Sequence, residues 1–512
     1  MSNLPSIPAL VMSDFYKTDH RRQFPDGTTT VYSNFTPRGS RLGNVDHVVF
    51  FGLQYFCIEY LQKRFTETFF ALPKQVAVEA YRRRLDNSLG KDSVPIEHIA
   101  ALHELGYLPL RIKALPEGAR VPMQVPTHTI ENTDPRFAWL TNFIETLMSC
   151  TVWGPTTSAT MAFQYRQVFE AYAARTGAPR DFIRWQGHDF SFRGMFGLEA
   201  ACLSGAGHLL SFTGTDTIPA IDFHEIYYGA DCTRELIGGS VPATEHAVMC
   251  AGGKETELET YRRLITRIYP QGIVSVVSDT WDFFAVVTNI LPQLRKEILA
   301  RNGKLVIRPD SGDPVKILVG DQDAPVGTPE HKGLIELLWE IFGGTKTDRG
   351  FKVLDSHIGA IYGDSITLER QLAILEGLAQ KGFASCNVVL GIGSYTYQYV
   401  TRDTFGFAMK ATFCTVQGED REIYKQPRTD SKKNSHRGLI AVHRDTNGEY
   451  VAAFPVSRAQ EESADNLLKV VFEDGKLVRP TTLAQMRNEV ETALARTVHA
   501  TDFPAKVPAE AQ

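Results

Sequence analysis

Between about residues 185 and 395, short apolar strands alternate with polar turns and amphipathic helices. The predicted strands cover residues 208–212, 273–277, 305–307, 358–362 and 387–390. A helix is expected at 367–381, where leucines recur on one face and Gly382 follows as the cap. Because these strands are short, rich in β-branched residues and separated by helices, the pattern predicts a parallel sheet or an α/β barrel.

Most of the predicted strands run directly into an acidic residue or a glycine-rich turn. These endings are Thr215–Asp216, Ser278–Asp279, Arg308–Asp313, Gly363–Asp364 and Gly391–Ser394. In a parallel α/β barrel the carboxyl ends of the strands converge on one face, and the functional site lies there. A single ending of this kind arises by chance, whereas a series of them predicts a binding or catalytic site.

Charge and composition narrow the class of protein. A formal net charge of -5 over 512 residues gives no global argument for binding nucleic acid or an anionic membrane. No apolar run approaches the ~18 residues of a membrane span, and the first residues lack the features of a secretion signal. The seven cysteines are far apart and form no Cys-x-x-Cys pair, which predicts reduced, mostly buried thiols in a cytoplasmic protein. The absence of a His-x-x-x-His pair argues against a zinc site.

The segment from Arg308 to Asp313, of sequence RPDSGD, is the strongest single motif. The guanidinium of Arg308 offers a planar fork for a phosphate or an amide oxygen, and the aspartates can hold ribose hydroxyls or Mg²⁺. This combination suits a phosphorylated sugar. The alternative is a salt-bridged surface turn, but the apolar strand before the motif favours a functional role.

Two further segments carry candidate groups. In residues 187–194 a flat ring can stack on Phe190 while Arg193 meets an anion, although the segment is equally readable as a packed loop. In residues 240–246 a turn is expected to open a helix with Pro242 near its first turn. His246 in that position can act as a nucleophile or proton carrier, and a lone histidine is otherwise structural.

Taken together, these segments resemble the nicotinate/nicotinamide phosphoribosyltransferase family, and its nicotinamide-specific bacterial members in particular. The matching segments occur in the family's order at residues 14–17, 51–55, 131–135, 187–190, 214–217, 240–246, 276–279, 307–312 and 401–403, with Lys410. The resemblance covers nearly the whole chain. It implies an irregular parallel α/β barrel at about 151–399 and a second α+β domain built from residues 1–150 and about 400–512.

The resemblance also implies a reaction: nicotinamide and 5-phosphoribosyl-1-pyrophosphate give nicotinamide mononucleotide and pyrophosphate, in NAD salvage. Phe190 and Tyr16 are expected to sandwich the nicotinamide, with Tyr16 supplied by the partner of a homodimer with shared sites. Arg308 is expected to bond the carboxamide oxygen and Asp216 its NH₂, which rejects the carboxylate of nicotinate. The remaining family roles concern the phosphates and the ribose.

In the family pattern, phosphate groups meet Arg193, Arg38, Arg402, Lys410 and Lys433. Ribose hydroxyls or metal are held by Asp310 and Asp364, and the 5′-phosphate by Gly363, Gly393 and Ser394. His188 and Asp14 complete the substrate-binding set. Mg²⁺ is expected to be held through pyrophosphate, with Asp310 as the candidate protein ligand.

By the same resemblance, ATP is a co-substrate that phosphorylates His246, with Glu245 and Asp279 beside it. The chain departs from the family in the shorter glycine run at 391–395 and in Ala408, where animal enzymes carry serine. Two alternative identities stay open. One is a nicotinate phosphoribosyltransferase, against which Asp216 argues. The other is a non-catalytic dimeric binding protein of the same fold.

Overall fold

The computed structural model of the protein describes residues 7–363, 365–424 and 436–497. The chain forms two compact units. Unit 1 comprises Met1–Thr160, His224–Ala230 and Val400–Val490, and unit 2 comprises Met161–Phe223, Asp231–Tyr399 and Glu491–Gln512. The division of the sequence near residues 150 and 400 into separate domains stays a prediction.

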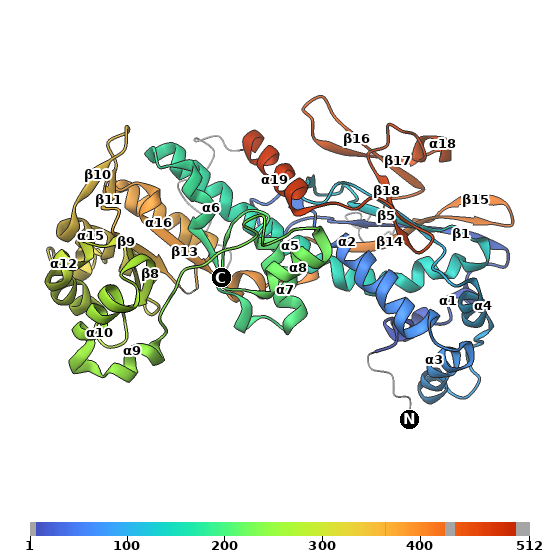
Figure 1. The fold of residues 1–512 in the computed structure, drawn as a ribbon. Coiled ribbons are helices and arrows are strands. Elements are labelled where there is room, and N and C mark those ends of the chain that lie inside the picture. The colour runs from blue at the N-terminus through green and yellow to red at the C-terminus, as the bar shows by residue number, and fades with distance from the viewer. Residues whose placement is uncertain (1–6, 364, 425–435, 498–512) are drawn as a thin grey trace. The chain divides into compact units, whose positions relative to one another are not determined.

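Unit 2 contains a six-stranded sheet of order β7-β6-β13-β12-β9-β8, in which all neighbouring strands are parallel. The strands are β6 (Gly187–Asp189), β7 (Gly214–Thr215), β8 (Gln271–Val277), β9 (Asn302–Arg308), β12 (Ile358–Tyr362) and β13 (Val388–Ile392). Helices α12 (Leu291–Leu299), α15 (Leu334–Phe342) and α16 (Leu368–Gln380) lie beside these strands (Figure 1). The predicted α/β class with a parallel sheet is confirmed.

The two edge strands of this sheet are joined by the segment 239–243, which we call the closing segment. Gly239 forms a parallel bridge with Gly214 of β7, and Ala243 forms one with Ser275 of β8. The sheet therefore curls into an irregular barrel rather than staying open, as the predicted fold requires.

Local sequence signals explain the elements of unit 2. The N-cap Thr367 accepts a hydrogen bond from the backbone N–H of Arg370, and Gly382 with φ +76° follows the last turn of α16. Leu305 and Ile307 of β9 are fully buried, and each contributes about 1.5–3 kcal/mol by leaving water. The strand predicted at 208–212 is wrong, because α7 (Leu198–His208) and a turn occupy most of it. A short apolar run fits a buried helix end as well as a strand.

The other helices of unit 2 are mostly short. They are α6 (Ile183–Gln186), α9 (His246–Gly252), α10 (Glu257–Arg263), α11 (Phe283–Ala285), α13 (Pro314–Val319), α14 (Pro329–Lys332) and α17 (Ser394–Tyr397). A hairpin pairs β10 (Gly344–Lys346) with β11 (Lys352–Leu354).

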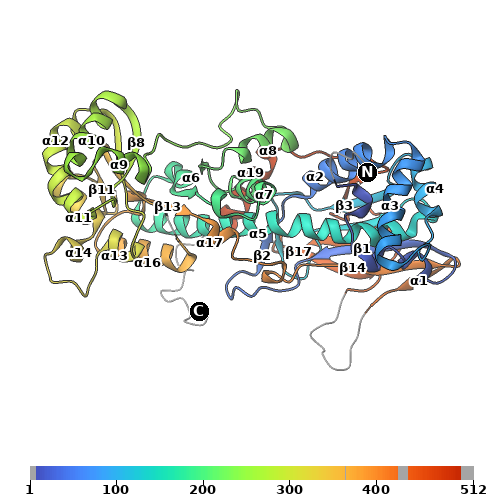
Figure 2. The same cartoon turned by 90° about the horizontal axis from the view of Figure 1, so that it is seen from below.

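Unit 1 is built on a seven-stranded antiparallel sheet of order β15-β14-β1-β5-β3-β18-β19. The strands are β1 (Thr28–Thr36), β3 (Leu110–Ala114), β5 (His128–Asn132), β14 (Ala408–Val416), β15 (Glu419–Glu422), β18 (Lys469–Glu473) and β19 (Lys476–Leu477). β1 confirms the strand predicted at 28–35. It pairs with β14, nearly 400 residues later, as Figure 2 shows.

Short pairs and helices complete unit 1. The pairs are β2 (His47–Val49) with β4 (Arg120–Pro122) and β16 (Leu439–Arg444) with β17 (Tyr450–Val456). The helices are α1 (His20–Gln23), α2 (Leu53–Tyr55), which continues as a π-helix over Phe56–Arg64, α3 (Lys74–Leu89), α4 (Glu97–Leu105) and α18 (Arg458–Glu461). Three helices have residues in both units: α5 (Ala138–Thr176), α8 (Pro219–Tyr228) and α19 (Leu483–Thr497).

Two expectations from composition are tested here. None of the helices in the described ranges combines the length and apolarity that crossing a bilayer requires. None of the seven cysteines is joined to another in a disulfide. The expectation that they are mostly buried is wrong: Cys57 and Cys414 are buried, whereas Cys150, Cys232 and Cys250 are exposed.

Candidate active site

The predicted residues of unit 2 lie at the carboxyl ends of its parallel strands. Phe190 follows β6, Asp216 follows β7, Asp279 comes two residues after β8, Arg308 ends β9 and Gly393 follows β13. These strands are neighbours in the sheet, so side chains far apart in the sequence reach one face of the barrel.

A cavity of about 810 Å³ opens at this face. The predicted residues that line it are Phe190, Arg193, Glu245, His246, Arg308, Asp310, Gly363, Gly393 and Ser394. A second cavity of about 380 Å³ has a mostly apolar wall and is lined by His188, Phe190, Asp216 and Arg308 among others. Because Phe190 and Arg308 line both, an apolar chamber adjoins a polar one, which fits a flat ring joined to a charged sugar phosphate.

Asp279 connects His246 to the turn after β9. Its Oδ1 lies 3.1 Å from Nε2 of His246, and its Oδ2 accepts hydrogen bonds from the backbone N–H of Asp310, at 3.0 Å, and from the hydroxyl of Ser311. The Asp279 side chain is 6% exposed, whereas that of His246 is 46% exposed. Burial alone raises the pKa of Asp279, but the hydrogen bonds it accepts lower the pKa below its ordinary value.

His246 is the first residue of α9, and Glu245 is the N-cap residue, whose side chain makes no capping bond. The expectation that Pro242 lies near the first turn of this helix is wrong. Pro242 belongs to the closing segment, where its carbonyl accepts a hydrogen bond from the backbone of Ser275. Proline lacks a backbone N–H, but the bond to Ser275 uses only the carbonyl of Pro242. An extended position in this segment is therefore compatible with proline.

Arg308 and Asp216 line the apolar cavity. One NH₂ group of Arg308 donates to the carbonyl of Thr244 at 2.6 Å, and its buried Nε finds no acceptor within the described residues. The Asp216 side chain is 44% exposed. Burial raises the pKa of Asp216, but hydrogen bonds from His188 and Ser240 and the nearby charge of Arg308 outweigh it and lower the pKa.

Phe190 lies against a strand that has no side chain at the point of contact. A Cβ on Gly391 of β13 would lie 2.7 Å from Cδ2 of Phe190, so only glycine fits there. The Phe190 ring is tilted by 38° against the ring of His188, with 4.5 Å between centroids. The ring is half-buried and remains accessible from the cavities for stacking.

At the polar end of the larger cavity, glycines permit close approaches. A Cβ on Gly363 would lie 2.6 Å from Oδ1 of Asp310, and one on Gly194 would lie 2.1 Å from Oγ of Ser394. The carboxylate of Asp310 has no hydrogen-bond partner in the part of the chain that is described. Asp310 and Gly363 therefore place a carboxylate acceptor beside a backbone that has no side chain. A sugar hydroxyl or a metal-bound phosphate requires such an arrangement.

Three predicted phosphate-binding residues of unit 1 are brought together by the β1–β14 pair. Lys410 of β14 is opposite Asn34 of β1, and Nε of Arg38 donates to the carbonyl of Gly406 at 2.8 Å. Arg402 precedes that loop and is exposed. Arg38 therefore lies at the same end of the two paired strands as Arg402 and Lys410, which follow it by more than 360 residues in the sequence.

The N-terminal candidates also belong to unit 1. Tyr16 lies in a short 3₁₀ turn, Phe15–Lys17, and is 64% exposed. The carboxylate of Asp14 accepts a hydrogen bond from the hydroxyl of Thr146 at 2.6 Å. This bond anchors the segment that presents the Tyr16 ring.

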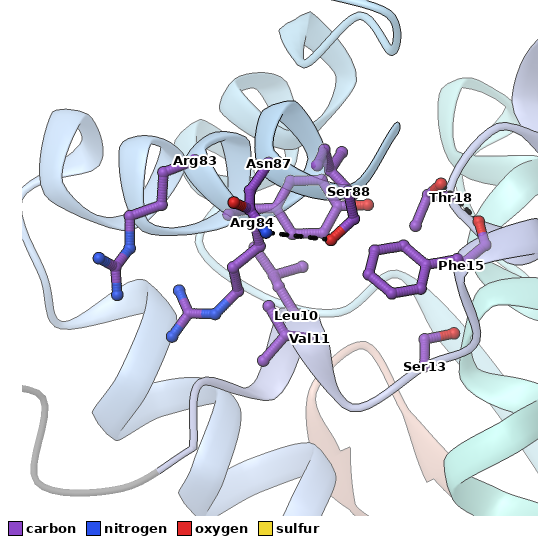
Figure 3. Close-up of a pocket in the computed structure, with 11 residues that line it drawn as sticks. Leu10, Val11, Ser13, Phe15, Thr18, Arg83, Arg84, Asn87 and Ser88 are labelled. Carbon is purple, nitrogen blue, oxygen red and sulfur yellow. Dashed lines mark hydrogen bonds between the residues drawn. The ribbon is translucent and has the colours of Figure 1, made fainter. Parts of the chain in front are cut away.

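A cavity of about 540 Å³ lies beside this segment within unit 1 (Figure 3). Leu10, Phe15, Tyr81 and Leu85 form its apolar part, and Arg83 and Arg84 reach it from α3. It contains none of the predicted site residues, so it does not compete with the strand-end cavities as the reaction site.

Two predicted residues, Asp364 and Lys433, lie outside the described residues. Sequence reasoning assigned no role to Ser240 and Thr244, although both stand within a motif it singled out. Their hydrogen bonds to Asp216 and Arg308 place them in the site. The only available signal was their position between Gly239 and His246.

Within the described ranges, no three His, Cys, Asp or Glu side chains converge as a metal site. Mg²⁺ commonly keeps several waters and binds through one or two carboxylates and the phosphates of a substrate. The carboxylate of Asp310, which faces the cavity and has no partner among the described residues, fits that manner of binding.

Comparison with known proteins gives two matching family models. One is described as the nicotinate phosphoribosyltransferase (NAPRTase) family and matches residues 185–476. The other is described as the N-terminal domain of nicotinamide phosphoribosyltransferase and matches residues 8–112. Together they span both units.

Curated relatives match over most of their length. A nicotinamide phosphoribosyltransferase of Acinetobacter baylyi is 53% identical over 493 residues, covering 94% of this chain and 96% of the relative. One of Xanthomonas campestris is 35% identical over 489 residues, covering 94% and 98%.

Solved structures share the fold at low identity. A nicotinate-nucleotide pyrophosphorylase from Pyrococcus furiosus superposes with a TM-score of 0.59 at 15% identity, covering 97% of each chain. The human nicotinic acid phosphoribosyltransferase does so with a TM-score of 0.51 at 15% identity, covering 94% of each. Fold, matching models and relatives agree: the chain is an enzyme of the nicotinate phosphoribosyltransferase family.

Proposed function

We propose that the protein is a nicotinamide phosphoribosyltransferase of NAD salvage. It joins nicotinamide to 5-phosphoribosyl-1-pyrophosphate and releases pyrophosphate. The observation that carries this proposal is the placement of Phe190, Arg308 and Asp216 around one apolar cavity at the strand ends. Relatives at 53% and 35% identity that carry this name support it.

The chemistry of the three side chains matches the amide substrate. The ring of Phe190 stacks on the pyridine, and the guanidinium of Arg308 donates to the carboxamide oxygen. Asp216 accepts from the amide NH₂, and its lowered pKa keeps it ionised near neutral pH. Nicotinate, with a carboxylate at that place, would meet a like charge, which disfavours the acid.

Transfer of the phosphoribosyl group requires charged groups at the polar cavity, opposite the nicotinamide-binding residues. As pyrophosphate departs, positive charge develops on the sugar and negative charge on the leaving group. Asp310 holds ribose hydroxyls, and the backbone at Gly363 and Gly393 holds the 5′-phosphate. Asp310 would hold Mg²⁺ together with the pyrophosphate, and the ion would supply charge neutralisation for the leaving group.

ATP is proposed as co-substrate, with His246 as the phosphate acceptor. The Asp279 carboxylate, 3.1 Å from Nε2 of His246, orients the ring, and exposure of the ring leaves it open to a γ-phosphate. Because Asp279 also binds the backbone of Asp310, a change at His246 is transmitted to the sugar-binding turn.

The functional unit is proposed to be a cytoplasmic homodimer with shared sites. The exposed ring of Tyr16 is the second half of the nicotinamide sandwich and comes from the partner chain. Arg38, Arg402 and Lys410 form the basic cluster that meets phosphate groups.

The test compares rates with nicotinamide and nicotinate, each with phosphoribosyl pyrophosphate and Mg²⁺. We expect a strong preference for nicotinamide. A strong preference for nicotinate would establish the alternative substrate, and no mononucleotide from either would favour a non-catalytic binding protein.

A second experiment addresses the histidine. His246→Ala is expected to abolish ATP hydrolysis coupled to turnover while some ATP-independent transfer remains. ATP hydrolysis at the wild-type rate in this variant would refute the assignment of His246 as phosphate acceptor.

A further inference from the structure

We propose that Ser240 and His188 are positioning residues that hold one oxygen of Asp216, so that its other oxygen alone receives the amide of the substrate. They thereby set the selectivity for an amide over an acid. The inference rests on the proposed function and deepens it. It concerns how the carboxylate is held, which the identity of Asp216 does not determine.

The hydrogen bonds at Asp216 are unevenly divided between its two oxygens. Oδ1 accepts from the hydroxyl of Ser240 at 2.6 Å and lies 2.8 Å from Nε2 of His188. A carboxylate oxygen has about two lone-pair sites, so Oδ1 is saturated. Oδ2 has no partner from any described residue, which leaves it as the acceptor for a ligand.

The fold fixes His188 from several sides. Its side chain is 9% exposed, and its ring contacts that of Phe190. A Cβ on Gly214 of the adjacent strand β7 would lie 2.8 Å from Nδ1 of His188, so the ring occupies the space that glycine leaves. A side chain this confined presents Nε2 in one direction only.

Ser240 is held by the closing segment. The backbone of its neighbour Gly239 donates to the carbonyl of Thr213 at 2.8 Å and accepts from Thr215 at 2.9 Å. These bonds tie the closing segment to β7, immediately before Asp216. The closure of the barrel is therefore what brings the Ser240 hydroxyl to the carboxylate.

Two donors on Oδ1 have two consequences for the ligand. They stop rotation of the carboxylate, so that Oδ2 stays aimed at the amide, and they favour the ionised form, which can only accept. An acceptor of fixed direction selects a ligand that donates there. Without Ser240 the carboxylate can turn or bind a proton, and a protonated carboxyl can donate to an acid ligand.

The experiment uses steady-state kinetics of the full-length enzyme with Ser240→Ala, Ser240→Thr and the control Ser204→Ala. Ser204 is a buried serine of α7 that lines neither strand-end cavity, and its hydroxyl donates to the carbonyl of Ala201 at 3.3 Å. Loss of a hydrogen bond to a charged group predicts a rise of about 10-fold in KM for nicotinamide and a similar fall in the amide-to-acid ratio of kcat/KM. The KM for phosphoribosyl pyrophosphate stays unchanged, Ser240→Thr restores the ratio, and the control matches the wild type.

A double-mutant cycle shows whether Ser240 acts through Asp216. Ser240→Ala is expected to have no further effect on selectivity when it is added to Asp216→Asn. His188→Gln keeps a donor and is expected to retain more selectivity than His188→Ala.

The failures can be told apart. A wild-type enzyme that prefers nicotinamide, together with a Ser240→Ala variant of unchanged selectivity, overturns this inference and leaves the proposed function standing. An equal rise in the KM of both substrates, or an additive effect with Asp216→Asn, also overturns it by showing a general structural role. A wild-type enzyme that does not use nicotinamide overturns both.

Discussion

The close approach of Gly363 to Asp310 offers a substitution whose effect can be worked out from geometry. In Gly363→Ala the new Cβ would lie 2.6 Å from Oδ1 of Asp310, whereas an ordinary contact begins near 3.4 Å. The Asp310 carboxylate must therefore move by roughly 0.8 Å. Alanine keeps the backbone N–H that is proposed to meet the 5′-phosphate, so the displacement of Asp310 is the main change.

A displacement of this size is large for a group that positions a sugar. Misplacement by about 1 Å can cost on the order of 10²-fold in rate, so we expect kcat/KM to fall by about 10- to 100-fold. That corresponds to about 1.4–2.7 kcal/mol of transition-state stabilisation. The loss should appear in kcat or in the KM for phosphoribosyl pyrophosphate, while the binding of nicotinamide alone is unchanged.

The matched control is Gly359→Ala on β12, the strand that Gly363 directly follows. Its Cβ would lie 3.2 Å from Cδ of Lys304, a flexible side chain that can move aside. Activity within about twofold of the wild type is expected there. The reasoning about Asp310 is refuted if Gly363→Ala keeps wild-type kcat/KM, or if both variants lose activity to the same extent.

Two further predictions concern stability. Because the pKa of Asp279 is lowered in the fold, its contribution is present above its ordinary pKa of 3.8 and is lost as the pH falls through the lower folded value. The difference in Tm between wild type and Asp279→Asn should therefore be constant above about pH 5 and shrink below pH 3.8; a difference that grows in acid would contradict this. In unit 1, Lys113 binds the buried carboxylate of Glu461 at 2.8 Å, and Lys113→Ala should destabilise the protein by about 3–5 kcal/mol in chemical denaturation. A loss below about 1 kcal/mol would show that Glu461 protonates or finds another partner.

The strands of the barrel were predictable because their signal is local. Runs such as 273–277 and 305–307 are rich in β-branched residues, which favours a parallel strand over a helix end, and the acids that follow them are placed by chain direction alone. The closing segment 239–243 carries no such signal. It makes isolated bridges rather than a strand, and its sequence, Gly-Ser-Val-Pro-Ala, has no period. Closure depends on the edges of a sheet that exists only after the strands assemble.

The basic cluster of unit 1 was beyond local reasoning for a related physical reason. Arg38 and Lys410 come to the same end of two strands because β1 pairs with β14, and a pairing over nearly 400 residues is set by the whole sheet. The resemblance to a family supplied these residues one by one. Their gathering at one end of two paired strands is information that the structure adds.

The aspartates after β8 and β9 show most clearly what sequence position leaves open. Asp279 and Asp310 both follow a buried parallel strand, and both were expected to take part in chemistry. In the fold, both oxygens of Asp279 are occupied by protein groups, whereas the Asp310 carboxylate has no protein partner in the described part of the chain. A carboxylate whose two oxygens are both engaged by protein groups orients its neighbours, whereas one without a described partner, beside a bare glycine, can accept a sugar hydroxyl or a metal-bound water. The distribution of hydrogen bonds, rather than the residue type, therefore determines which aspartate at this site orients its neighbours and which one binds a ligand.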